Sequence, residues 1–352
     1  MHLPTTPARL LGLGTAVPPH KLPQDLVRIV ATQILGARYP DFERLSKSFV
    51  TSGIETRYSV VPFEWFEEPK DWPARTSAYL EGAIELFIAA AEQALDASGL
   101  SAEDIDTIVT ISSTGIATPT LEARAMRRMN FRADVHRVPV FGLGCAGGVS
   151  GLALAARLAM TAPGSKVLLV CVEACTLSFR ADRMQKADVI ATVLFGDGAA
   201  AACLSTESEV GPAFGIGEEH TWPDTLPIMG WEVDHDGFGV VFDRSIPEFI
   251  KAKFAAAVDE ALEAMGMNQA GLQRMICHPG GAKVVDAIES ALHLGQGSLD
   301  YERDVLREYG NMSAPTALFV LKRVVDNAPE GDMLLAALGP GFTASLLPIR
   351  FS

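Results

Sequence analysis

Cysteine is scarce in this 352-residue chain, and the spacing of the cysteines does not indicate a disulfide framework. The five cysteines are an odd number, and no two of them make a C-x-x-C pair. This argues against a disulfide scaffold and a zinc site, so we expect no metal. Long apolar runs are also missing: none approaches the roughly 20 residues of a membrane-spanning helix, and prolines interrupt the short apolar patch at the N-terminus. We therefore expect a cytoplasmic protein without membrane insertion.

Basic residues are outnumbered, with 29 Lys and Arg against 43 Asp and Glu and a net charge of −14. Nucleic acid and anionic membranes are poor partners for such a surface. Any site for a phosphate must then be a local concentration of Arg and Lys. Hydrophobic residues (48%) and charged residues (20%) occur in the proportions of an ordinary folded protein, and the length allows a large core.

Apolar strand-like runs alternate with helical stretches, which predicts an α/β fold with layered helices and strands. The predicted strands include residues 106–112, 138–141, 167–173, 274–278 and 333–338, and the predicted helices include residues 82–98, 149–160 and 249–265.

Part of this pattern is repeated at a nearly constant offset. The matching pairs are Ile108 with Met275, Cys145 with Asn311, and Lys166 with Asp332, which differ by 167, 166 and 166 positions. Agreement of three offsets in the same order indicates two duplicated halves, 1–205 and 206–352. The first half carries an insertion within residues 175–192, of the kind that shapes a pocket or an interface. Residues 205–246, rich in Gly and Pro, are predicted to be mostly loop.

Cys145 differs from the other cysteines in its setting. It lies in FGLGCAGGVSG, where a strand, a glycine-rich turn and a small-residue helix follow one another. The start of a helix favours a thiolate and lowers the pKa of a cysteine, and the glycines let backbone N–H groups approach an acyl oxygen. Cys145 is therefore a candidate nucleophile, although the motif alone also suits a buried cysteine in a tight turn.

The same segment permits a different interpretation. Gly142, Gly144 and Gly147 match the spacing of a dinucleotide-binding loop, and Glu173 ends the next strand. A nicotinamide-dependent oxidoreductase is thus the alternative from another class. Against it, a cysteine occupies the loop, and the second copy of the unit has no matching glycines.

His278 and Asn311 are the candidates to assist Cys145. Of seven histidines, only His278 ends an apolar strand and precedes a rigid Pro-Gly-Gly turn, where it can meet a thiolate from another strand end. Asn311 begins the helix that repeats the Cys145 helix, so the duplication predicts that the two lie close together. Its amide can hold a thioester carbonyl, although by itself it could also be an N-cap. The Asp234–Asp236 segment (DHD) resembles a metal hook but has no further ligands nearby.

With Cys145 in GCAGG, His278 in HPGG and Asn311 in GNMS, the chain resembles the type III polyketide synthases, the chalcone synthase-like branch of the thiolase fold. The resemblance covers nearly the whole chain, including FGDGAA from Phe195 and the loop Gly339-Pro340-Gly341. It implies a thiolase-like α-β-α-β-α fold. A ketoacyl-ACP synthase III is the related alternative, from whose asparagine-containing motifs HPGG and GNMS depart.

The resemblance also implies a mechanism. An acyl-CoA starter acylates Cys145, assisted by an ion pair with His278. Malonyl-CoA then loses CO₂ while His278 and Asn311 hold its thioester carbonyl, and the enolate attacks the acyl-cysteine. The substrates are acyl-CoA and malonyl-CoA, no metal or redox cofactor is needed, and the protein is expected to be a homodimer.

The resemblance assigns substrate-binding roles to further residues. Phe195 matches a gatekeeper phenylalanine, while the second gatekeeper position falls on Val240, Val241 or Phe242. Substrate-binding residues are further expected at Cys175, Ser178, Thr118, Gly339 and Gly341, with Thr118 where relatives reach into the partner's site. Arg44 and Lys47 resemble the basic helix at the CoA tunnel, although a solvated helix face fits them too. A fatty acyl starter giving an alkylpyrone or alkylresorcinol is favoured over an aromatic or a malonyl-only starter. A catalytically silent binding protein of the same fold is the third alternative.

Overall fold

The computed structural model describes residues 1, 3–36, 39, 42–180, 185–327 and 329–352. Ten of the described strands form one mixed sheet, paired in the order β12-β13-β14-β8-β1-β7-β6-β4-β5, with β9 beside β14. In chain order these are β1 (Arg9–Ala16), β4 (Thr107–Ile111), β5 (His136–Val140), β6 (Val167–Ala174), β7 (Asp197–Ser205), β8 (Ala213–Phe214), β9 (Glu218–Thr221), β12 (Arg274–Cys277), β13 (Gly331–Gly339) and β14 (Thr343–Phe351).

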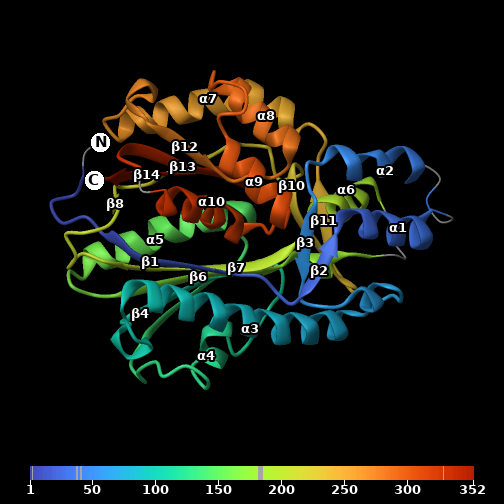
Figure 1. Ribbon diagram of the computed structural model, residues 1–352, viewed down its shortest axis with the longest axis horizontal. Helices are drawn as coiled ribbons and strands as arrows, with labels where there is room; N and C mark the ends of the chain where they lie inside the picture. Colours follow the sequence, from blue (N-terminus) through green and yellow to red (C-terminus); the bar gives the residue numbers. More distant parts are fainter. Residues whose placement is uncertain (2, 37–38, 40–41, 181–184, 328) are drawn as a thin grey trace.

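The helices separate this sheet into layers (Figure 1). Two central helices, α5 (Gly147–Thr161) and α10 (Ala314–Asp326), lie between the β1-β7-β6 part and the β12-β13-β14 part. The first part is covered on its outer side by α3 (Trp72–Ser98) and α4 (Leu121–Ala125), and the second by α7 (Ile246–Ala264) and α8 (Ala282–Ala291). The order of layers is therefore α-β-α-β-α, which confirms the predicted fold class. Every residue of β6 and β7 is buried, because helices cover both faces.

The two halves repeat one topology. In the first, β4 pairs parallel with β6, β6 antiparallel with β7, and β7 antiparallel with β1. In the second, β12 pairs parallel with β13, β13 antiparallel with β14, and β14 antiparallel with β9. The repeats seen in the sequence fall on β4 and β12, on the turns before α5 and α10, and on β6 and β13. The duplication is thus a property of the fold.

The connection between the halves differs from its prediction. Instead of a loop, residues 205–246 contain β8, β9 and a hairpin of β10 (Met229–Asp234) and β11 (Gly237–Phe242). The glycines that suggested a loop lie partly at strand ends; Gly237, for example, opens β11 with φ +110°. The two strands of this hairpin are short, so their alternation of side chains is hard to recognise in the sequence among residues that are typical of turns.

Five further elements gather at one end of the molecule, on the right of Figure 1. They are β2 (His20–Pro23), β3 (Thr56–Ser59), α1 (Gln24–Leu35), α2 (Phe42–Thr51) and α6 (Lys186–Leu194). The predicted insertion supplies α6 and a 3₁₀ turn over Cys175–Ser178, while residues 181–184 lie outside the described part. Among the described residues, no helix is both long and apolar enough to cross a bilayer.

Glycine allows α5 and α10 to approach closely. A Cβ atom on Gly148 would lie 2.3 Å from the backbone oxygen of Ala314, and one on Gly147 would lie 2.7 Å from the side chain of Ile111. Both distances are far below van der Waals contact. The glycines after Cys145 therefore serve helix packing, and they bring the start of α5 next to the start of α10.

Candidate active site

Cys145 lies in a 3₁₀ turn, Gly144–Ala146, that leads directly into α5. Positive φ angles at Gly142 (+95°) and Gly144 (+50°) form the bend before it. The hydroxyl oxygen of Ser113 accepts the N–H groups of both glycines, at 3.1 and 3.2 Å. These two N–H groups are therefore occupied, and the approach of other backbone N–H groups of the turn to an acyl oxygen stays a prediction.

The three predicted catalytic residues line one pocket of about 410 Å³. Cys145 comes from the start of α5, His278 from the end of β12, and Asn311 from the turn before α10. We refer to this space as the catalytic pocket. Its other walls are apolar side chains of α7, α8, β11 and β13, among them Phe242, Ile250, Phe254, Val284, Ile288 and Leu338.

Hydrogen bonds fix the amide of Asn311. Its Nδ2 donates to the carbonyl oxygen of Gly280 at 3.1 Å, and its Oδ1 accepts the N–H of Ser313 at 2.8 Å. Ser313, with φ +59°, is the residue that precedes α10, so Asn311 does not cap that helix. The bond to Gly280 ties Asn311 to the His-Pro-Gly-Gly turn, and one amide hydrogen is left to face the pocket.

Burial keeps both reactive groups uncharged in the free pocket. Burial raises the pKa of Cys145 to about 11, against the opposing effect of hydrogen bonds with Ser313 and Asn311. Burial also lowers the pKa of His278 to about 4, and neither ring nitrogen has a partner among the described residues. These shifts oppose the predicted thiolate in the ligand-free protein, and the ion pair between Cys145 and His278 stays a prediction. Loss of solvation raises the pKa of Cys145 more than its position at the start of a helix lowers it.

Glu173 is a buried acid beside this site. Its Oε2 accepts the N–H of Ser113 at 2.9 Å and the hydroxyl of Thr114 at 2.7 Å, and burial raises its pKa to about 8. Its charge contributes to raising the pKa of Cys145. Its signal in the sequence is its place at the end of the apolar run VLLVCVE, where a glutamate is costly to bury without a role.

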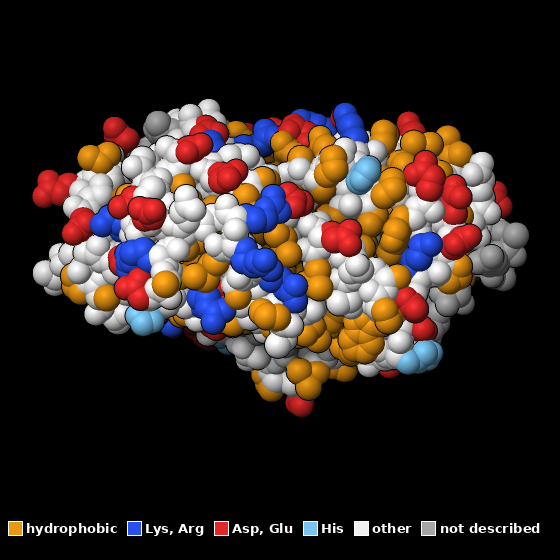
Figure 2. All heavy atoms as spheres, turned by 90° about the horizontal axis from the view of Figure 1, so that it is seen from below, with side chains coloured by type: hydrophobic (Ala, Val, Ile, Leu, Met, Phe, Trp, Pro, Cys, Tyr) orange, Lys and Arg blue, Asp and Glu red, His pale blue; other side chains and the backbone are white. Residues whose placement is uncertain are grey.

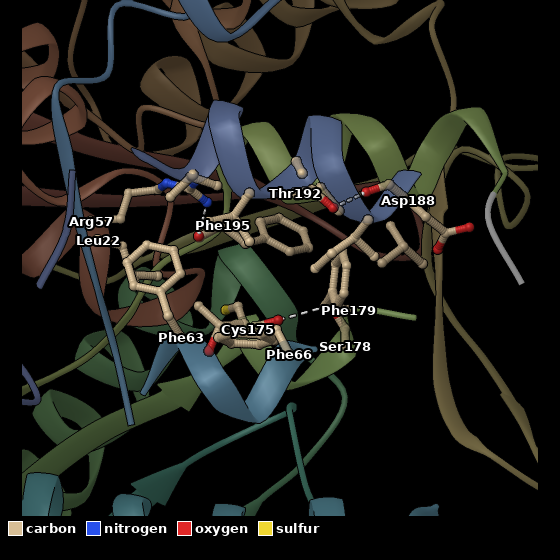
Figure 3. Close-up of a pocket in the computed structure, with 17 residues that line it drawn as sticks. Leu22, Arg57, Phe63, Phe66, Cys175, Ser178, Phe179, Asp188, Thr192 and Phe195 are labelled. Carbon is tan, nitrogen blue, oxygen red and sulfur yellow. Dashed lines mark hydrogen bonds between the residues drawn. The ribbon is translucent and has the colours of Figure 1, made fainter. Parts of the chain in front are cut away.

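A second space, the α1–α6 cavity, has an empty volume of about 600 Å³ that includes space open to solvent (Figure 3). Three predicted substrate-binding residues line it, namely Phe195, Cys175 and Ser178. Of the three candidates for the second gatekeeper, Val240 lines this cavity and Phe242 lines the catalytic pocket. Arg57, which the sequence did not suggest, lines the α1–α6 cavity next to Phe195.

A third space lies on the other side of Ser178. This Trp231 cavity of about 390 Å³ is bounded by Trp72, Tyr79, Trp231 and Phe238, and it shares Ser178 with the α1–α6 cavity. The ring of Trp231 lies 6.2 Å from that of Phe195, edge to face. Trp231 therefore stands between the two cavities, a position that depends on the unpredicted hairpin.

The other predicted residues line neither the catalytic pocket nor the α1–α6 cavity. Gly339 packs under the nucleophile turn, where a Cβ would lie 2.7 Å from the backbone nitrogen of Ala146. Gly341 has φ +125°, and its carbonyl accepts the hydroxyl of Thr225 at 2.9 Å. Thr118 is exposed in the loop before α4, and Arg44 and Lys47 are exposed on α2. Their binding roles stay predictions.

The Asp-His-Asp segment forms the turn of the β10–β11 hairpin, with possible ligand atoms within 4.8 Å of one another. Asp234, however, holds the buried guanidinium of Arg180 through two bonds of 2.9 and 3.0 Å. This ion pair gives Asp234 a role that needs no metal.

The fold has five layers and two duplicated halves. A cysteine lies at the start of one central helix, and a histidine and an asparagine come from the other half. Together these features define the class of thiolase-fold condensing enzymes. Within that class, the chain belongs to the chalcone and stilbene synthases: residues 3–208 match the N-terminal domain of that family and residues 217–350 its C-terminal domain. It is thus an acyltransferase-type polyketide synthase. Members of the family act on CoA thioesters without a required cofactor, and this membership decides against the dinucleotide-binding interpretation.

Similar proteins cover nearly the whole chain. A 1,3,6,8-tetrahydroxynaphthalene synthase of Streptomyces peucetius is 37% identical over 97% of this chain and 92% of its own. A putative chalcone synthase of Bacillus subtilis is 32% identical over 97% of this chain and 98% of its own. The crystal structure of the tetrahydroxynaphthalene synthase of Streptomyces coelicolor aligns with a TM-score of 0.93 at 26% identity, covering 98% of this chain and 99% of the other.

Proposed function

We propose that this polyketide synthase extends an acyl-CoA starter with malonyl-CoA, with Cys145 carrying the growing chain. The observation that supports the proposal is the convergence of Cys145, His278 and Asn311 on one pocket. Neutral His278 suits the first step, in which it accepts the thiol proton as Cys145 attacks the starter thioester and returns it to the departing CoA thiolate.

His278 and Asn311 then serve the malonyl group. Their N–H groups hold the thioester carbonyl of malonyl-CoA, which gains negative charge as CO₂ leaves and an enolate forms. The enolate carbon attacks the acyl-cysteine, the Cys145 thiolate departs, and the longer chain is transferred back from CoA to Cys145. The apolar walls of the catalytic pocket support these steps, because exclusion of water strengthens the hydrogen bonds to the developing charge.

For the starter we propose a fatty acyl group, with an alkylpyrone or alkylresorcinol as the product. The α1–α6 cavity supports this choice, since aliphatic and aromatic side chains make up most of its wall. A malonyl-only reaction giving an aromatic product is the second candidate, favoured by the 37% identity to a tetrahydroxynaphthalene synthase. Mass spectrometry of the products from acyl-CoAs of different length, each with malonyl-CoA, distinguishes the two.

For the CoA phosphates we propose Arg44 and Lys47, with Lys283 beside them. Lys283 is exposed at the start of α8, and a Cβ on Gly53, just after α2, would lie 3.9 Å from its neighbour Ala282. Lys283 therefore lies near the end of α2, the helix that carries Arg44 and Lys47.

We further propose a homodimer in which Thr118 lies at the partner. The edge strand β5 is largely exposed, and beside it runs an open groove lined by Ile116, Leu121, Pro139 and Phe141. Figure 2 shows the face over α3 and α4, where apolar side chains lie next to a band of basic ones. A mass in sedimentation near 37.6 kDa, that of one chain, would contradict the dimer.

The central test is Cys145→Ala. We expect it to fold normally, as judged by circular dichroism, and to form no product from acyl-CoA and malonyl-CoA. Cys203→Ala, at a buried cysteine of β7 distant from the catalytic pocket, is the matched control and keeps activity. Product formation by Cys145→Ala would refute the proposal.

A further inference from the structure

The imidazole of His278 is not oriented by hydrogen bonds within the described part of the chain. Neither ring nitrogen has a partner there, although the residue is only 4% exposed. The direction of the ring therefore depends on packing and on the backbone that carries it. Where a reaction depends on the placement of its groups, an error of about 1 Å can cost about 10²-fold in rate. Residues that fix the backbone at His278 are thus candidates for a role in the reaction.

The strand that leads to His278 lies at an edge of the sheet. Among the described strands, β12 pairs with β13 alone. The N–H of His278 donates to the carbonyl oxygen of Ala336 on β13 at 2.9 Å. Successive N–H groups of a strand point to opposite sides, so the N–H of Cys277 points away from β13 to the open edge. A buried N–H group at that edge needs an acceptor that is not a strand.

Glu302, on α9 (Asp300–Tyr309), supplies this acceptor. Its Oε1 accepts the N–H of Cys277 at 2.8 Å, and its Oε2 accepts a bond from Nη2 of Arg274, also on β12, at 2.9 Å. The side chain of Glu302 is fully buried, and burial raises its pKa to about 7 against the opposing effect of Arg274. A buried carboxylate is costly, and here two bonds to the same strand offset that cost.

The helix that carries Glu302 also leads to Asn311. It ends two residues before Asn311, whose amide donates to the carbonyl oxygen of Gly280 at 3.1 Å. Glu302 thus binds the residue before His278, and Asn311 binds the turn after it. One short helix and the turn that follows it therefore hold the backbone on both sides of His278.

We propose that Glu302 is a positioning residue, which sets the place of the His278 imidazole through the N–H of Cys277. Glu302 itself does not line the catalytic pocket. The inference rests on the proposed function, in which His278 holds the thioester carbonyl of malonyl-CoA. Without Glu302 the end of β12 is released, and the imidazole no longer meets the developing negative charge at a fixed distance.

Decarboxylation of malonyl-CoA by the full chain tests the inference, with rates counted per folded molecule as judged by circular dichroism. We expect Glu302→Ala to lower kcat by about tenfold or more and to leave KM nearly unchanged. Glu289→Ala is the matched control and should keep kcat. Glu289, on α8, is likewise buried and accepts backbone N–H groups, those of Gly297 and Leu299 at 3.0 Å, which lie outside β12.

A double-mutant cycle separates positioning from a general loss of structure. In the His278→Ala background, Glu302→Ala should change the remaining decarboxylation rate by about twofold or less, because no imidazole is left to place. Equal fold-losses in the two backgrounds overturn the inference, as does a normal kcat of the Glu302→Ala enzyme. If Glu302→Ala does not fold, Glu302→Leu, which fills the space without an acceptor, replaces it in every measurement.

Nuclear magnetic resonance of the protein with histidine labelled at Cε1 detects the same effect without catalysis. Glu302→Ala should shift or broaden the His278 signal, which is assigned by its loss in His278→Ala, whereas Glu289→Ala should leave it in place. An unchanged His278 signal in Glu302→Ala overturns the inference. A normal decarboxylation rate of His278→Ala would instead refute the proposed function, and the histidine signal would then decide the inference by itself.

Discussion

Phe195 and Asn311 are joined backbone to backbone by a parallel β-bridge. The N–H of Asn311 donates to the carbonyl of Leu194 at 2.8 Å, and the N–H of Gly196 donates to the carbonyl of Asn311 at 3.0 Å. The backbone at the proposed gatekeeper is therefore tied to the backbone of the residue whose amide faces Cys145. This bridge links the α1–α6 cavity to the catalytic pocket.

From the placement of Asn311 we predict that Asn311→Ala lowers kcat by about 10²–10³, because a donor to the developing oxyanion is lost. Acylation of Cys145 by a starter should persist, and intact-protein mass spectrometry would detect it. Asn327→Ala, at an exposed asparagine after α10, is the control and should keep full activity. A normal kcat of the Asn311→Ala enzyme would show that Asn311 takes no part in the mechanism.

The raised pKa of Cys145, about 11, predicts slow and pH-dependent alkylation. Below that pKa the thiolate fraction increases about tenfold for each pH unit, so the rate with iodoacetamide should increase steadily from pH 7 to pH 10. Peptide mass spectrometry measures the rate at Cys145 against the four other cysteines. A rate that is already constant near pH 7 would instead indicate a stable ion pair with His278.

Glu173 should make the protein less stable as the pH rises. Its folded pKa of about 8 lies above the ordinary value of 4.5, so its contribution is complete below about pH 4.5 and is lost as the pH rises through 8. We predict that Glu173→Gln gains stability relative to the unaltered protein at pH 9, by on the order of 2–4 kcal/mol, and gains none from this source at pH 4. Urea unfolding at both pH values measures this; a difference independent of pH contradicts it.

The contact between α5 and α10 predicts a strong effect of one methyl group. Gly148→Ala would place a Cβ 2.3 Å from the backbone oxygen of Ala314 and should lower the free energy of unfolding by about 1–3 kcal/mol. Gly295→Ala meets nothing within 4 Å and is the matched control. Equal stability of the two variants in urea would show that the central helices can separate without cost.

Trp231 should limit the length of the bound acyl chain. Trp231→Ala removes the indole between Phe195 and the Trp231 cavity, which should join two spaces of about 600 and 390 Å³. We expect the preferred starter or product to become longer by several carbon atoms, as read from the masses of the products formed with a series of acyl-CoAs. An unchanged product distribution would show that the chain does not extend in this direction.

The positions of Cys145, His278 and Asn311 were predictable because each belongs to a local signal. A strand end, a glycine turn and a helix start are encoded by neighbouring residues, and the repeat at 166–167 positions brought the two halves into register. The strands around Ile108 and Met275 were predictable for the same reason, because a run of apolar residues indicates a buried strand without knowledge of which strands pair with it. These features follow from the order of residues along the chain.

Tertiary structure alone decided how these residues behave. The direction of the pKa shifts at Cys145 and His278 depends on the exclusion of solvent by segments that are distant in sequence. A local motif contains no information about this exclusion. The assignment of Val240 and Phe242 to different cavities, and the positions of Arg57 and Trp231 beside Phe195, depend on how β3 and the β10–β11 hairpin pack around Phe195. Local sequence thus determined which groups lie at the ends of strands and helices. Long-range packing determined their charge and the shape of the pocket that they line, because the segments that exclude water and form the cavity walls are far apart in sequence.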